Sequence, residues 1–134
     1  MLTDAGVPFS VQVADVDEDA VKAVHGPANA AGLAVELACV KALAVSRHDE
    51  DAWVLGADQT LGFDGGLISK AASLADARAR LSAMRGRTHQ LHSGAALARS
   101  GQIVWSGVDT ATMRVRDFSE AFLDAYLAAE GEAL

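Results

Sequence analysis

The sequence predicts a single α/β domain, because stretches with strand periodicity and stretches with helix periodicity follow one another along the chain. Phe9, Val11 and Val13 alternate with polar residues, which is typical of a strand with one buried face. Strong helix formers with an apolar stripe fill residues 28–46. A short, mostly apolar run beginning at Trp53 indicates a buried strand. With the later segments, these observations predict the element order β-α-β-β-α-β-β-α.

Length and composition fit this class. The chain has 134 residues, of which 51% are apolar and 22% charged, so we expect one domain over residues 1–134. Neither an internal repeat nor a low-complexity linker divides it. The net charge of −7 argues against a nucleic-acid partner, which would require a basic stripe. A small phosphorylated ligand held by a few local cations remains compatible with this charge.

The single cysteine and the apolar runs indicate the compartment. Cys39 has Ala38 and Val40 as neighbours, which favours a buried thiol over a nucleophile, and one cysteine fits a reducing compartment. No apolar run approaches the roughly 20 residues of a membrane span. Residues 1–4 lack the basic and apolar regions of a signal peptide. We therefore expect a cytoplasmic protein without a membrane partner.

The first elements are a strand over residues 7–13 and a helix over residues 28–46, with an acidic run between them. Pro27 stands where a first helical turn tolerates proline. The apolar stripe of the helix comprises Leu33, Leu37, Val40 and Ala44. Lys41 borders this stripe, so its ammonium group requires either an acidic partner or a route to water.

A hairpin and a second helix are predicted next. Asp64-Gly-Gly66 separates two apolar segments, and its glycines accept the positive φ of a tight turn. Ser73 with Asp76 three residues later resembles a capping box that opens a helix. The apolar face of this helix comprises Leu74, Ala77, Leu81 and Met84. Gly86 is expected to end it.

The last elements are two long strands and a helix. Residues 88–98 and 102–115 predict strands joined at Ser100-Gly101. Phe118 and Ser119 indicate a hydrophobic staple and an N-cap. The residues expected to point inward from the final helix are Phe122, Leu123, Tyr126 and Leu127.

Asp58 is the strongest candidate for chemistry. It follows the apolar run from Trp53, and ligands of open α/β sheets bind beyond strand ends. Asp58 either caps a turn there, or binds a divalent metal or takes a proton from water. Two of the chain's three lysines, Lys41 and Lys70, flank it in the sequence and suit phosphate contacts as point charges. Glu18, from the acidic run, either completes a hard-cation site with Asp58 or lies in a solvated loop.

The histidines give weaker evidence for a functional site than Asp58 does. His89 and His92 are three apart in a predicted strand, so they point to opposite faces and make a poor metal pair. The segment Arg87-Thr-His89 either lines a crevice or has a structural role, and the sequence favours the structural role.

Taken together, the chain resembles the Maf family of nucleoside triphosphate pyrophosphatases. The matching stretches occur in the family's order over nearly the whole chain. They are Ala5-Gly-Val-Pro-Phe9, Asp15-Val-Asp-Glu18, Leu37-Ala-Cys-Val-Lys-Ala42, Val54-Leu-Gly-Ala-Asp-Gln-Thr60, Gly66-Leu-Ile-Ser-Lys70, Leu81-Ser-Ala-Met-Arg-Gly-Arg-Thr-His89 and the region from Tyr126 to Glu132.

The resemblance implies an elongated, mixed-sheet α/β fold similar to that of ITPases, with a central cleft. It implies a cytoplasmic, often homodimeric enzyme that cuts a nucleoside triphosphate between the α and β phosphates with Mg²⁺ or Mn²⁺. By position, Asp58 would accept the proton of the attacking water and share a metal with Glu18. Lys41 and Lys70 would hold phosphates, and Gln59 and Thr60 would also contact the substrate.

Gln59 bears on the choice of substrate. Members similar to the branch that hydrolyses dTTP and UTP carry Asp-Thr at this step. Members with Asp-Gln resemble the branch that acts on 7-methyl-GTP. The pair Asp58-Gln59 therefore favours a modified purine nucleotide.

The chain also departs from the family pattern. The family's first strand and its Ser-x-Ser-x-x-Arg phosphate loop are missing, and family members continue beyond Leu134. The expected Lys-Pro is Lys70-Ala71. We therefore expect a domain truncated at both ends, with impaired activity. The alternatives are a non-catalytic nucleotide-binding remnant and a dimerisation module built on the two long strands.

Overall fold

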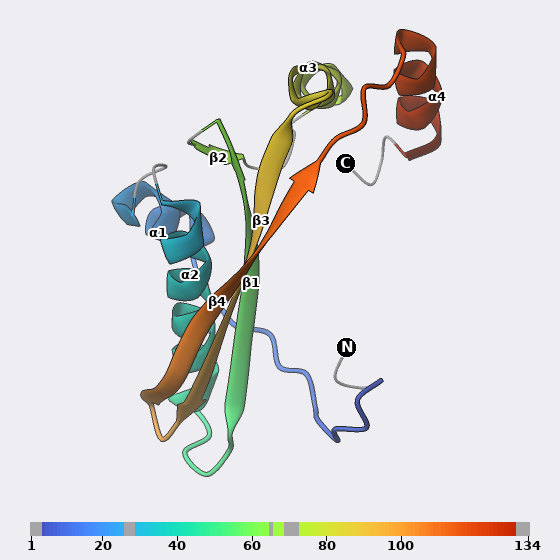
Figure 1. Ribbon diagram of the computed structural model, residues 1–134. Coiled ribbons are helices and arrows are strands. Elements are labelled where there is room, and N and C mark those ends of the chain that lie inside the picture. The colour runs from blue at the N-terminus through green and yellow to red at the C-terminus, as the bar shows by residue number, and fades with distance from the viewer. Residues whose placement is uncertain (1–3, 26–28, 65, 69–72, 131–134) are drawn as a thin grey trace.

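The structure, a computed structural model, describes residues 4–25, 29–64, 66–68 and 73–130. It confirms the α/β class (Figure 1). In chain order its elements are α1 (Glu18–His25), α2 (Ala30–Ser46), β1 (Val54–Phe63), β2 (Gly66–Ile68), α3 (Leu74–Met84), β3 (Thr88–Arg99), β4 (Gln102–Arg114) and α4 (Glu120–Glu130). Within these ranges no helix is both long and apolar enough to cross a membrane.

The four strands form one long sheet in the order β2-β1-β3-β4. β1 pairs with β3 from Val54↔Ala98 to Gly62↔Gln90, and β4 pairs with β3 along nearly its whole length. β2 is short, and within the described residues it pairs with Leu61–Phe63 alone. Every pairing among the described strands is antiparallel, so the parallel pairs that a mixed sheet requires are not among them.

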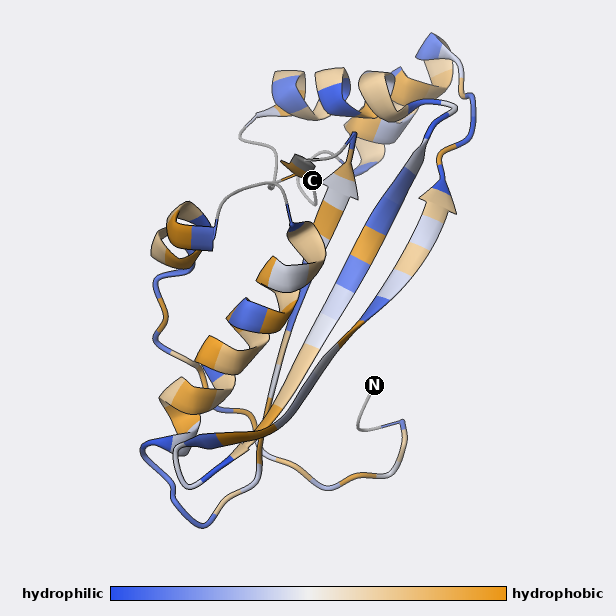
Figure 2. Cartoon of the chain, turned by 60° about the vertical axis from the view of Figure 1, so that its left-hand side comes forward, coloured by the Kyte–Doolittle hydropathy of each residue, from blue (hydrophilic) through white to orange (hydrophobic). Residues whose placement is uncertain are grey.

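Helix α2 lies along one face of this sheet and builds the core with it (Figures 1 and 2). Its N-cap is Asn29, whose side chain accepts a hydrogen bond from Gly32 N at 2.9 Å. The fully buried side chains of α2 include Leu33 and Leu37. The helix begins two residues later than expected, and Pro27 lies outside the described residues.

The middle of the core is made of small side chains, and Cys39 packs against it. Ala38 and Ala42 of α2 meet Ala96 and Ala98 of β3 in one buried cluster. Cys39 is half-buried at the edge of this cluster. Its packing agrees with the structural role that its apolar neighbours predict.

Helices α3 and α4 lie side by side at one end of the sheet (Figure 2). Ser73 and Ser119 cap them as expected, since each hydroxyl accepts a hydrogen bond from the backbone N three residues later. Arg78 of α3 joins the two helices through ion pairs with Asp124 and, at 2.9 Å, with Glu120.

The expected inward face of α4 is confirmed only in part. Leu123 is buried and Leu127 is half-buried, but Phe122 is 57% exposed and Tyr126 is also exposed. Among the described elements α3 is the main neighbour of α4, and the contact between them is small, so few side chains of α4 are buried.

The expected strand over residues 7–13 is also wrong. This segment has no regular structure, and Val11 and Val13 are 83% and 88% exposed. Alternation marks an apolar face, but a strand also requires a neighbouring strand to pair its backbone groups. None of the described strands pairs with this segment.

Helix α1 replaces the solvated loop that the acidic run suggested. Asp17 caps it, since its Oδ1 accepts a hydrogen bond from Ala20 N at 3.1 Å. Glu18 and Asp19 occupy the first turn, where the helix dipole favours negative charge. The run of acids therefore marks the start of a helix that places Glu18 toward α2.

Candidate active site

Asp58 lies in the middle of β1, opposite Gly94 of β3, and not at a strand end. The expected strand end was wrong because the alternation of buried and exposed residues continues through Thr60 and Gly62, both of which face α2. The crevice therefore lies beside the strand. β2 covers only the last residues of β1, and along residues 54–60 the described structure has a strand on one side only.

The carboxylate of Asp58 is held on one oxygen and open on the other. Its side chain is 18% exposed. Oδ1 accepts a hydrogen bond from the backbone N of Gln59 at 2.8 Å. Oδ2 is buried, and its one neighbour among the described cationic groups is Lys41 Nζ at 3.4 Å, which does not form a hydrogen bond of good geometry with it. An incompletely satisfied buried carboxylate oxygen is rare in native proteins and agrees with a catalytic role or with a bound water molecule or ion.

Lys41 connects Asp58 to Glu18. From α2 its Nζ lies 2.7 Å from Glu18 Oε1 and 3.4 Å from Asp58 Oδ2. Burial lowers the pKa of Lys41, but the hydrogen bond to Glu18 and the charges of both carboxylates outweigh burial, so the net pKa is raised. Lys41, which borders the apolar stripe of α2, therefore has two acidic partners, Glu18 and Asp58, and it stays charged at neutral pH.

The cluster of Glu18, Lys41 and Asp58 fits a divalent cation in its chemistry. It combines two carboxylates, the ligands that Mg²⁺ prefers, with an unsatisfied Asp58 oxygen. The described residues contain no group of three His, Cys, Asp or Glu side chains able to hold a metal by themselves. A cation here would therefore take its other ligands from substrate phosphates and water, as Mg²⁺ commonly does.

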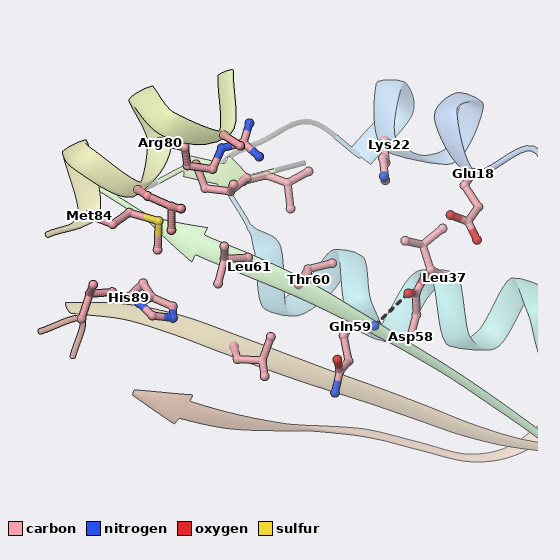
Figure 3. Close-up of a pocket in the computed structure, with 16 residues that line it drawn as sticks. Glu18, Lys22, Leu37, Asp58, Gln59, Thr60, Leu61, Arg80, Met84 and His89 are labelled. Atoms are coloured by element: carbon pink, nitrogen blue, oxygen red, sulfur yellow. Dashed lines mark hydrogen bonds between the residues drawn. The ribbon is translucent and has the colours of Figure 1, made fainter. Parts of the chain in front are cut away.

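A cavity of about 560 Å³ opens beside these residues (Figure 3). Its volume is within the usual range of ligand sites. Glu18, Lys22 and Asp58 line one end, while His89 and Met84 lie at the other (Figure 3). The apolar lining comes mainly from α3 and the adjoining strands: Leu61, Leu67, Ile68, Ala77, Leu81 and Leu91.

Gln59 and Thr60 both line the cavity, but each already has a hydrogen-bond partner. Gln59 Nε2 donates to Ser93 Oγ at 3.2 Å. Thr60 is buried, and its Oγ1 donates to the carbonyl oxygen of Ala30 at 2.5 Å. The Thr60 hydroxyl proton is thus directed at the start of α2 and not at the cavity.

The remaining predicted phosphate contact, Lys70, lies outside the described residues, as does Ala71 after it. The structure adds Lys22, Arg80 and His89 to the cavity lining. Lys22 follows Glu18 by one helical turn, so predicting α1 would have identified it.

The two histidines have different surroundings, in agreement with their predicted orientation. His92 Nδ1 shares a hydrogen bond with Thr110 Oγ1 at 2.8 Å. His89 lines the cavity, and its Nδ1 is buried without a hydrogen-bond partner among the described residues. Within residues 87–89 only His89 lines the cavity, whereas Arg87 has the structural role that the sequence favoured, through an ion pair with Asp64 at 3.0 Å.

Comparison with known proteins gives a consistent assignment. The family model described as Maf, Maf-like protein, matches residues 1–134. A protein of Maricaulis maris is 48% identical over 134 residues, covering 100% of this chain and 68% of the relative. One of Nitrobacter winogradskyi is 45% identical over 133 residues, covering 99% and 66%. One of Caulobacter vibrioides is 46% identical over 136 residues, covering 100% and 68%.

All three relatives carry the name nucleoside triphosphate pyrophosphatase. The chain spans about two thirds of their length. A family match over the whole chain, together with these identities, shows that the chain belongs to the Maf family.

Proposed function

We propose that the chain is a nucleoside triphosphate pyrophosphatase, which hydrolyses its substrate to the monophosphate and pyrophosphate. The observation that carries this proposal is that Glu18 and Asp58, from two separate elements, line one end of a nucleotide-sized cavity. Lys41 of a third element forms ion pairs with both carboxylates there. The names of the relatives support the same reaction.

Asp58 suits the role of proton acceptor. Its Oδ1 is oriented by Gln59 N, while Oδ2 keeps free lone pairs for a water molecule. In the proposed step the oxygen of the water molecule bonds to the α phosphorus, and a proton of that water passes to Asp58. The bond between the α phosphorus and the oxygen that bridges the α and β phosphates breaks. The bonding electrons stay on that oxygen, which leaves as part of pyrophosphate.

The other charged residues would hold the substrate. Glu18 and Asp58 would bind Mg²⁺ or Mn²⁺, which would neutralise phosphate charge as it develops. Lys41, kept protonated by its two carboxylates, would contact the phosphates as a point charge. On the family resemblance alone, Lys70 would add a second phosphate contact.

The finer proposals rest on the same resemblance. The position of Gln59 beside Asp58 in the cavity lining agrees with a role in substrate choice, and Asp-Gln favours 7-methyl-GTP. We also propose a homodimer in the cytoplasm.

A coupled phosphate assay tests the reaction. The chain is incubated with a nucleotide panel that includes 7-methyl-GTP, with Mg²⁺ or Mn²⁺, and with or without added inorganic pyrophosphatase. We expect phosphate to appear only when pyrophosphatase is present. Asp58→Asn should lower kcat by about 10²- to 10⁴-fold, the usual contribution of a general base.

Asp109→Asn provides a matched control. Asp109 also lies within a strand, and its Oδ1 accepts a hydrogen bond from the next backbone N at 3.0 Å, but it is exposed on β4. Its substitution should leave the rate unchanged. Unchanged hydrolysis by Asp58→Asn would overturn the catalytic assignment. Nucleotide binding without turnover would favour the non-catalytic binding remnant. The absence of both binding and turnover would favour the dimerisation module.

A further inference from the structure

The two ends of the cavity differ in the charge and polarity of the side chains that line them. The end beside α1 is charged, with Glu18, Lys22 and Asp58 (Figure 3). The end beneath α3 is mostly apolar and contains the buried side chain of Met84, with Arg80 of α3 as its one charged lining residue among the described residues (Figure 3). A nucleotide has the same arrangement, with charged phosphates at one end and a flat, weakly polar base at the other.

The length of the cavity agrees with this arrangement. Gln90, the neighbour of His89, pairs with Gly62, which lies four residues along β1 from Asp58. At about 3.3 Å per strand residue, the two ends are about 13 Å apart. The α phosphate, ribose and purine base of a nucleotide together extend over a similar distance.

His89 and Arg80 are the polar residues that line the mostly apolar end. Its Nδ1 is buried without a partner among the described residues, although the ring lines the cavity. A neutral imidazole has one donor and one acceptor nitrogen, so either tautomer can complement a group on the edge of a base. A buried nitrogen without a partner indicates a ligand atom that would complete its hydrogen bonding.

The surrounding side chains suit a flat aromatic ligand. Leu61 of β1 pairs with Leu91 of β3 and with Ile68 of β2, and all three line the cavity. Met84 adds a polarizable thioether, which makes favourable contacts with aromatic rings. Apolar walls with a small number of polar groups are the usual composition of a specific small-molecule subsite.

We propose that the apolar end of the cavity, beneath α3, is the nucleobase subsite and that His89 Nδ1 forms a hydrogen bond with the base. This inference rests on the proposed function, because it assigns the orientation of the substrate at the same site. His89 is thereby a specificity residue, which contacts the substrate far from the reacting phosphorus.

Steady-state kinetics of His89→Phe tests this role. Phenylalanine keeps the ring but removes the nitrogen atoms. For the preferred nucleotide we expect kcat/KM to fall about tenfold or more, as expected for a lost buried hydrogen bond. The inhibition constant of inorganic tripolyphosphate, which has no base, should not change. His92→Phe, three residues away on the same strand, should change neither quantity.

A second variant separates the hydrogen bond from folding. Asparagine places a polar atom close to the position of His Nδ1, so His89→Asn should recover part of the loss. Circular dichroism melting curves establish whether each variant folds. If His89→Phe does not fold, His89→Leu, which also lacks the nitrogen atoms, takes its place, and an unchanged kcat/KM in that variant would overturn the proposal.

Three results would contradict the subsite. They are unchanged kcat/KM in His89→Phe, an equal loss of tripolyphosphate affinity, and an equal effect of His92→Phe.

Binding distinguishes failure of the subsite from failure of the proposed reaction. The ¹⁵N shift of His89 Nδ1 should move when a non-hydrolysable triphosphate analogue is added, and should not move with tripolyphosphate. A change in the ¹⁵N shift without turnover would reject the proposed reaction and keep the subsite. Turnover without a change in the shift would reject the subsite alone. If neither turnover nor a change in the shift is observed, both proposals are rejected.

Discussion

Gly94 of β3 lies directly against the carbonyl of Ala34 in α2, so closely that a β-carbon on Gly94 would be 2.3 Å from that oxygen. Gly94 is also the pairing partner of Asp58. Its missing side chain therefore allows α2 to approach the sheet at the level of the candidate site. This approach brings Lys41 of α2 to within 3.4 Å of Asp58.

Gly94→Ala should destabilise the chain, because the added methyl group meets backbone atoms that cannot rotate away. We expect a loss of about 1–3 kcal/mol in the free energy of unfolding, measured by urea denaturation. Gly62→Ala is the matched control on β1. Its β-carbon would lie 3.2 Å from the end of the His92 side chain, which can move, so its loss should be smaller. Equal losses would contradict the helix–sheet contact as the cause.

Thr60→Val should lower stability more than it affects substrate binding. The variant loses the hydrogen bond from Thr60 Oγ1 to Ala30 O, which is worth about 1 kcal/mol. Urea denaturation measures this loss, with the exposed Thr112→Val on β4 as a control that should change little. The hydroxyl proton is already engaged, so KM for nucleotide should change little. A large rise in KM at unchanged stability would instead support the substrate contact that the family resemblance implies.

Local signals predicted much of this fold. The Ser73 and Ser119 caps and the β3–β4 turn at Ser100-Gly101 agree with the structure, where both turn residues have positive φ. The β1–β2 hairpin was also predicted. Each of these features depends on a few neighbouring residues, so the sequence alone carries the information.

Features that depend on distant segments were predicted poorly. The alternation of residues 7–13 predicts a strand, yet no described strand pairs with it. The site shows the same limit. Lys41 was expected to require a partner, but only the packing of α1, α2 and β1 makes Glu18 and Asp58 those partners. The burial of His89 Nδ1 without a hydrogen-bond partner among the described residues likewise depends on tertiary packing.

The raised pKa of Lys41 predicts a pH dependence of stability. Because the pKa is higher in the folded state, the ion pairs stabilise fully below the unfolded value of about 10.4. The stabilisation is lost as pH rises through the folded pKa. The difference in unfolding free energy between the parent chain and Lys41→Met should therefore be constant from about pH 7 to 9 and shrink above about pH 10.5.

Urea denaturation in EDTA at stepped pH measures this difference without bound metal. The titration of other groups cancels between parent chain and variant, so the difference reports Lys41 and its partners. A difference that stays constant up to about pH 11 would show that the folded pKa is not raised, and a difference that increases with pH would show that it is lowered.

Glu18→Gln should weaken the binding of divalent cations at the site, because it replaces one of the two carboxylates with a neutral amide of the same shape. We expect the Mg²⁺ concentration for half-maximal hydrolysis to rise by about tenfold or more, since even outer-shell partners of a metal contribute about 10- to 100-fold in affinity. Titration of Mn²⁺ into the chain with a non-hydrolysable nucleotide gives the same comparison without turnover. Asp19→Asn, the exposed neighbour in the first turn of α1, removes an equal charge and should change neither curve. Equal shifts in both variants would assign the effect to the general negative field of α1 and not to a ligand at Glu18.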